Sequence, residues 1–210
     1  MDLRIHNRLN TIFLGSLFVF QLIAIPIVGK GDKIHFFDSS SNYTNAISAQ
    51  WIGLVFHPKG GTYPTRYIRK LDPNAYFVVE QGLFLGYEHR VFDRAYIKTA
   101  AAYNMDCANV PAGFLHIGFY YQIISKKRHI LSAGLGPTFV FREDWHQFPE
   151  YIEDEFFKDS VYGKWQYRFV IFGDIEYNYQ VSRKMLLNVS LIPGGHLVMT
   201  FSFGLKYILK

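Results

Sequence analysis

The sequence is poor in the features on which disulfide-bonded domains and helical membrane proteins depend. Cys107 is the single cysteine among 210 residues, so no disulfide can form within the chain, and we expect it to be an incidental loop residue. Outside residues 11–28 the chain has no apolar run near the ~20 residues of a membrane-spanning helix. Because the mean hydropathy is only +0.03, a bundle of transmembrane helices is excluded.

Recognisable chemical signatures are equally scarce. The eight His residues show no H-E-x-x-H or other metal-ligand spacing, and no glycine-rich loop resembles a phosphate or dinucleotide site. The net charge is +5, but Lys and Arg are dispersed and accompany no helix-turn-helix or RNA-binding signature. We therefore expect no metal, no cofactor and no nucleic-acid partner, and the positive charge favours an anionic lipid surface.

Aromatic side chains are present in surplus. The chain has 20 Phe and 15 Tyr, more than the core of one soluble domain needs, so many must face another apolar medium. From Ile47 onward, apolar and polar residues alternate with period two between turn residues, which predicts antiparallel strands joined as hairpins. Eight strands are expected, at 47–56, 76–90, 94–105, 112–124, 129–142, 164–181, 185–192 and 196–209.

The connections between these strands alternate in length. Residues 91–93, 125–128 and 182–184 form short turns, whereas 57–75 and 143–163 are long, and the second set also includes 106–111 and 193–195. Short turns at one end and longer loops at the other are typical of closed up-and-down transmembrane β-barrels, with the short turns in the periplasm. The predicted fold is therefore an all-β, closed antiparallel barrel of about eight strands.

The faces of the strands support a membrane barrel. Along 196–209, Leu197, Phe201, Phe203 and Leu205 share one face, and the opposite face contains polar residues such as Lys206. A soluble barrel places its apolar residues inside, so charges opposite a continuous apolar band indicate a polar lumen and a lipid-facing exterior. Unpaired buried charge is costly, so we expect a plugged lumen in which the following residues form a polar network: Glu80, Glu88, Lys98, His116, Arg142, Arg168, Asp174, Glu176 and Lys206.

The amino terminus has the pattern of a secretory signal peptide. Arg4, His6 and Arg8 precede the apolar run of residues 11–28. We assign residues 1–30 to the signal peptide, with cleavage between Ala24 and Lys33, and 31–210 to the barrel domain. An uncleaved amino-terminal anchor is the alternative.

These patterns together resemble the small outer-membrane β-barrel proteins of Gram-negative bacteria, a class that includes structural barrels and lipid A modifying enzymes. The resemblance covers nearly the whole mature chain and implies an outer-membrane location, with lipid or lipopolysaccharide, and another envelope protein, as partners. The chain departs from the class at its end, because Tyr207-Ile208-Leu209-Lys210 does not finish on the aromatic residue that many barrels carry.

The sequence pattern is compatible with three functions. The leading hypothesis is a structural, anchoring or partner-binding barrel, and a subunit of a larger secretion or assembly complex has the same sequence pattern. The alternative is an acyltransferase or deacylase acting on lipid A or phospholipid, whose catalytic candidates at the external end are His57, Asp144, His146 and His196. The enzyme hypothesis lacks a convincing serine, because Ser132 is lower on its strand and no His-x-Ser dyad of the lipid A deacylase kind occurs.

Overall fold

The wall of the protein is an antiparallel β-sheet. The computed structural model describes residues 43–149, 151–152, 156–157, 161–194 and 198–209. Within these ranges the strands are β1 (Asn45–Phe56), β2 (Phe77–Phe92), β3 (Ala95–Met105), β4 (Pro111–Lys126), β5 (His129–Glu143), β6 (Val161–Tyr162), β7 (Trp165–Gln180), β8 (Met185–Pro193) and β9 (Met199–Leu209). A 3₁₀ turn, η2 (Trp145–Gln147), follows β5.

Each long strand pairs with the next long strand along the chain, and one further pairing, between the first and the last, closes the sheet. β1 pairs with β9, and β5 pairs with β7, so the described part of the chain forms a closed, eight-stranded, up-and-down barrel. β7 pairs with β8 only over Ile175–Gln180. The two-residue strand β6 pairs with the beginning of β7, at Trp165 and Gln166. The predicted fold class is confirmed, with strand ends within three residues of those expected. β6 was not predicted, because it is formed within a long loop.

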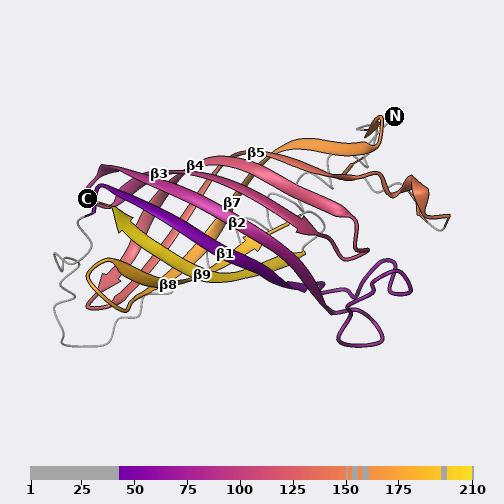
Figure 1. Cartoon of the computed structure of the whole chain (residues 1–210), viewed down its shortest axis with the longest axis horizontal. Coiled ribbons are helices and arrows are strands. Elements are labelled where there is room, and N and C mark those ends of the chain that lie inside the picture. The colour runs from indigo at the N-terminus through magenta and orange to yellow at the C-terminus, as the bar shows by residue number, and fades with distance from the viewer. Residues whose placement is uncertain (1–42, 150, 153–155, 158–160, 195–197, 210) are drawn as a thin grey trace, which may run out of the picture. The chain divides into compact units, whose positions relative to one another are not determined.

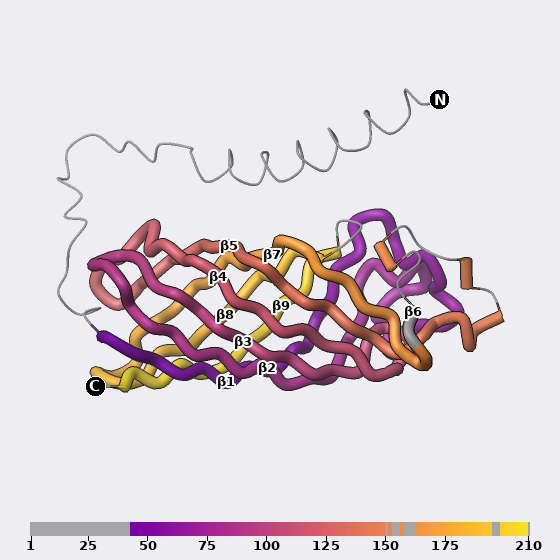
Figure 2. The backbone as a smooth tube through the Cα atoms, turned by 90° about the horizontal axis from the view of Figure 1, so that it is seen from above, coloured from indigo at the N-terminus to yellow at the C-terminus, as the bar shows by residue number. Residues whose placement is uncertain are grey.

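The two ends of the barrel differ, as Figures 1 and 2 show. β1 begins and β9 ends at the end with the short turns, which are residues 93–94, 127–128 and 181–184. The opposite end has the connections 57–76, 106–110, 144–164 and 194–198. The signal peptide predicted at 1–30 lies outside the described residues, as does the segment up to 42.

The sheet has an apolar outer face and a polar inner one. Phe169 and Ile171, which point outward from β7, are 75% and 73% exposed. On the opposite, inward face of β7 lie Asp174 and Glu176. Both are buried, as are Lys98 and Lys206 on other strands. Among the residues that the structure describes, no helix is long and apolar enough to span a bilayer.

A bulge in β1 reverses the alternation near the external end. The register shifts between Ile52 and Leu54, so the inward face changes from even to odd positions and His57 points inward. The residue at the bulge is Gly53, where a Cβ would lie 2.1 Å from the ring of Trp51. Glycine therefore lets the Trp51 ring lie flat against the outer wall.

Candidate functional site: the lumen network and the external cap

Buried ion pairs cross the lumen between strands that are not neighbours. Lys98 on β3 places its Nζ 2.9 Å from Asp174 Oδ2 and 3.0 Å from Glu176 Oε2, both on β7. Lys206 on β9 places its Nζ 2.5 Å from Glu176 Oε1 and 2.5 Å from Glu88 Oε1 on β2. The two ammonium groups thereby join β2, β3, β7 and β9 across the interior.

Neutral donors complete the network, because three carboxylates meet only two ammonium groups. Tyr43 donates its hydroxyl to Glu88 Oε2 at 2.8 Å, Tyr96 donates to Glu176 Oε2 at 3.5 Å, and Tyr120 donates to Asp174 Oδ1. Asn188 Nδ2 donates to Glu176 Oε1 at 2.5 Å. These hydrogen bonds stabilise the surplus negative charge, which would otherwise be very costly at this depth.

His116 extends the network toward the middle of the barrel. Its Nδ1 lies 2.7 Å from Thr138 Oγ1 and its Nε2 lies 2.9 Å from the Tyr120 hydroxyl. Beyond it, a small cavity of about 30 Å³ is lined by His116, Tyr120, Lys98 and Asp174 together with apolar side chains such as Phe84 and Phe172. Both His116 ring nitrogens therefore have a partner within the wall.

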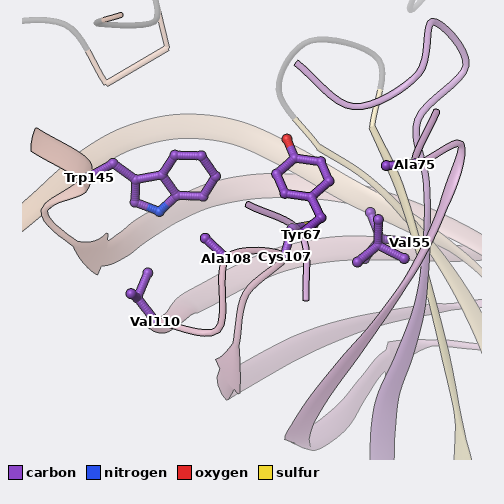
Figure 3. Packing of buried hydrophobic residues seen from close by; sticks show 8 residues of the cluster. Val55, Tyr67, Ala75, Cys107, Ala108, Val110 and Trp145 are labelled. Atoms are coloured by element: carbon purple, nitrogen blue, oxygen red, sulfur yellow. The ribbon is translucent and has the colours of Figure 1, made fainter. Parts of the chain in front are cut away.

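A second cluster, which we call the external cap, lies at the end of the barrel with the longer connections. Its buried residues come from the ends of β1 and β2 and from three loops, and they are Val55, Tyr67, Ala75, Val78, Cys107, Ala108, Val110 and Trp145. Figure 3 shows the rings of Tyr67 and Trp145 beside the segment from Cys107 to Val110. The loops at this end thus pack against one another.

Asp106 holds two of these loops together. Its Oδ1 accepts the backbone N–H groups of Ala108 at 2.9 Å and Val110 at 3.1 Å, and its Oδ2 accepts the indole N–H of Trp145 at 2.8 Å. Burial raises the pKa of this carboxyl group, while the hydrogen bonds from Val110 and Trp145 oppose that shift. Asp106 therefore links the β3–β4 turn to the loop after β5.

Cys107 lies in contact with His57 and Glu80 within the cap. Its Sγ donates to Glu80 Oε1 at 3.2 Å and lies 3.4 Å from His57 Nε2. Burial raises the pKa of the Cys107 thiol, and the Glu80 and Asp106 carboxylates act in the same direction. Burial also lowers the pKa of His57. The thiol thus remains protonated and donates a hydrogen bond, which does not suit a thiolate nucleophile.

The structure divides the predicted lumen residues among the network, the cap and the β5–β7 connection. Glu88, Lys98, Asp174, Glu176 and Lys206 form the ion pairs, and His116 reaches them through Tyr120. Glu80 lies beside Cys107, while Arg142 stacks between the rings of Trp145 and Phe157, and Arg168 donates to the carbonyl of Phe156 at 2.7 Å.

The residues proposed for catalysis are not gathered at one point. His57 is buried beside Cys107. His146 is exposed in the connection after β5, with its Nδ1 2.7 Å from Asp144 Oδ1. His196 lies outside the described residues. Among the described residues, no group of three or more His, Cys, Asp or Glu side chains could hold a metal ion.

Sequence reasoning missed several members of these clusters. Tyr43 precedes the first strand, and Cys107 was interpreted as an incidental loop residue although it is buried in the cap. Tyr96 and Tyr120 are at strand positions whose side chains point into the lumen. Nothing in the sequence shows that the hydroxyl group of either ring donates a hydrogen bond to a buried carboxylate. The alternation of side chains along the strands was therefore the one signal in the sequence that could have placed Tyr96 and Tyr120 in the network.

Loss of Asp106 is expected to open the cap. In Asp106→Ala the two backbone N–H groups and the Trp145 indole lose their acceptor, at a cost of about 1–3 kcal/mol for each buried group left unsatisfied. The rate at which a maleimide reagent labels Cys107 should rise at least about tenfold, since 1.4 kcal/mol corresponds to a factor of ten. Trp145→Phe, which removes one of the three donors, is the matched control and should give a smaller increase. An unchanged labelling rate in Asp106→Ala would contradict the assigned role.

An apolar exterior, paired charges inside and short turns opposite longer loops define a transmembrane β-barrel of the outer-membrane type. The fold class predicted from the sequence, a closed up-and-down transmembrane β-barrel of about eight strands, is thereby confirmed. No family model matches the chain, and no curated protein matches it.

Solved structures with a similar architecture include the outer membrane protein OprG from Pseudomonas aeruginosa, at 13% identity and a TM-score of 0.47, covering 82% of this chain and 99% of that one. Ail, the attachment invasion locus protein of Yersinia pestis, matches at 13% identity and a TM-score of 0.41, covering 79% of this chain and 97% of its own. A de novo designed transmembrane β-barrel matches at 10% identity and a TM-score of 0.41, with 80% and 97% covered.

Proposed function

We propose that the protein is a non-enzymatic outer-membrane barrel whose polar lumen is plugged and whose external cap anchors or binds another component of the envelope. The observation that carries the proposal is the set of ion pairs in which Lys98 and Lys206 both bind Glu176. These contacts join opposite parts of the wall of a barrel that is only wide enough for its side chains to fill it. Such a lumen serves as a rigid support for the loops.

A plugged lumen predicts that the wild-type barrel conducts no current. The protein would be inserted in planar lipid bilayers and compared with a porin of known conductance under the same salt and voltage. We expect no stepwise conductance, because ions crossing the lumen would have to displace the paired side chains at Lys98 and Lys206. Regular conductance steps from the inserted wild-type protein would overturn the plugged lumen.

The external loops supply the surface for a partner. Ile68 and Leu71 in the β1–β2 connection are 69% and 65% exposed, and Ile152 in the β5–β7 connection is 77% exposed. Apolar side chains exposed on loops suit contact with another envelope protein, either an anchored component or the rest of a larger secretion or assembly complex. The outward faces of the strands contact lipid and lipopolysaccharide. Affinity purification of the wild-type protein beside Ile68→Asp/Leu71→Asp tests the protein contact, which should be lost in the variant.

A second candidate, an acyl-modifying enzyme, is favoured by one observation. At the external end, the Asp144 carboxylate orients the exposed His146 ring, in the way that a carboxylate orients a histidine that acts as a general base. Among the described residues, no serine hydroxyl is within hydrogen-bonding distance of this pair, and Ser132 is buried in the wall. Mass spectrometry of lipid A from cells with the wild-type protein and with His57→Ala, His146→Ala or His196→Ala distinguishes the two functions. An acyl change that one variant abolishes would favour the enzyme.

A further inference from the structure

The end of the barrel with the short turns carries mainly positive charge. Among the described residues of its three turns and the adjoining strand ends, the basic side chains are Arg90, Arg94, Lys126, Lys127, Arg128, Arg183 and Lys184, and Asp93 is the acidic one. Lys126, Lys127, Arg128, Arg183 and Lys184 are exposed. We call the seven basic residues the cationic rim.

The turns that carry the rim are fixed to their neighbouring hairpins in the same way. The backbone carbonyls of Arg94, Arg128 and Lys184 accept hydrogen bonds at 2.8 Å from the N–H groups of Gln122, Gln180 and Ile208, respectively. Each turn is therefore bonded to the next strand around the barrel. The backbone that supports the charges is ordered before any ligand binds, which lowers the entropic cost of binding.

The rim lies next to an aromatic belt on the outer wall. Tyr87, Tyr121, Tyr177 and Tyr207 point outward from the halves of β2, β4, β7 and β9 near this end, with 39–47% of each side chain exposed. Tyrosine at such positions marks the boundary between hydrocarbon and lipid headgroups. Lys184 Nζ lies 5.9 Å from the centre of the Tyr207 ring. The cations therefore lie at the depth of the headgroups.

We propose that the cationic rim binds the phosphate groups of anionic phospholipids, such as phosphatidylglycerol, in the leaflet at the short-turn end. This inference rests on the membrane location in the proposed function and assigns lipid recognition to a second surface, away from the external cap. The rim cations are distributed over all three turns and follow the aromatic belt, as a lipid shell requires. A single acidic protein segment would instead match one compact patch.

The expected effect follows from the attraction between an exposed cation and an anionic lipid headgroup, which favours the anionic lipid about fivefold over a zwitterionic one. The full chain would be reconstituted in phosphatidylcholine vesicles with spin-labelled phosphatidylglycerol or spin-labelled phosphatidylcholine. Electron spin resonance gives the relative association of the two probes with the protein. We expect the wild-type protein to favour phosphatidylglycerol about fivefold, with less preference at high salt.

The test variant carries Lys126→Gln, Lys127→Gln, Arg128→Gln, Arg183→Gln and Lys184→Gln. The matched control removes the same number of cations from the external connections through Lys59→Gln, Arg66→Gln, Arg69→Gln, Lys70→Gln and Lys164→Gln. The rim variant should lose most of the preference, and the control should keep it.

Equal preference in the rim variant and the wild type would overturn the inference, as would an equal loss in the control. A wild-type barrel that inserts but shows no preference would also overturn it, and would direct attention to an acidic polymer as the partner. Failure of the wild type to insert would instead count against the proposed function.

Discussion

Replacing Lys206 by methionine is expected to lower the free energy of unfolding by about 3–5 kcal/mol. The Nζ of Lys206 is the group that lies between Glu88 and Glu176, at 2.5 Å from each, and the side chain is only 1% exposed. Methionine has a similar length and packs in the same space, but it leaves two buried carboxylates facing each other. Lys98 then remains as the nearby ammonium group for Glu176.

Urea unfolding of the protein in lipid vesicles, followed by the mobility of unheated samples in SDS gels, measures this change. Lys184→Met is the matched control, because Lys184 is exposed at the rim and its loss should change stability by less than about 0.5 kcal/mol. Adding Glu88→Leu to Lys206→Met should restore part of the stability by removing one uncompensated charge. Equal stability of Lys206→Met and the wild type would refute the role of the ion pairs in holding the wall together.

Gly173→Ala is expected to have the second large effect. A Cβ at Gly173 would lie 1.7 Å from the carbonyl oxygen of Gly134 and 2.8 Å from the Cα of Leu135, so β7 and β5 would have to separate. The obstacle is the backbone of β5, and no flexible side chain is present there to give way. Overpacking of this kind costs about 3 kcal/mol when the backbone must shift.

The effect of Gly173→Ala appears in the refolding yield into vesicles and in the urea midpoint. Gly163→Ala provides the control, because Gly163 has a φ of +62° but no heavy atom within 4 Å of the added Cβ. It should cost about 1–2 kcal/mol for the left-handed backbone conformation alone. If both variants were equally stable, close approach of β5 and β7 at Gly173 would not be the controlling feature.

The sequence predicted the strands and their faces because period-two alternation needs no knowledge of neighbours. Glu176 and Lys206 were assigned to the lumen by parity alone, and both are buried there. Parity does not say which buried cation meets which carboxylate. That depends on the register between β2, β1 and β9, which places Glu88 opposite Ala46 and Lys206 opposite Ser48.

The cap was less predictable, since loop geometry has no periodic signal. Nothing in the sequence indicates that Asp106 accepts the indole N–H of Trp145, which lies 39 residues further along the chain. Nor does it indicate that the bulge at Gly53 turns His57 toward Cys107. The proposed catalytic residues His57 and His146 were grouped by their external position, whereas their side chains have different partners.

The position of Lys206 on the last strand has a consequence for biogenesis. Glu88 and Glu176 precede Lys206 in the chain, and their shared counter-ion reaches them only when β9 pairs with β1 and the sheet closes. A chain that stops before β9 would leave Glu88 without its ammonium partner and Glu176 with Lys98 alone, and an uncompensated buried carboxylate is strongly unfavourable. We therefore expect stable closure of the barrel to depend on the complete carboxyl-terminal strand, because that strand supplies the last counter-ion of the lumen.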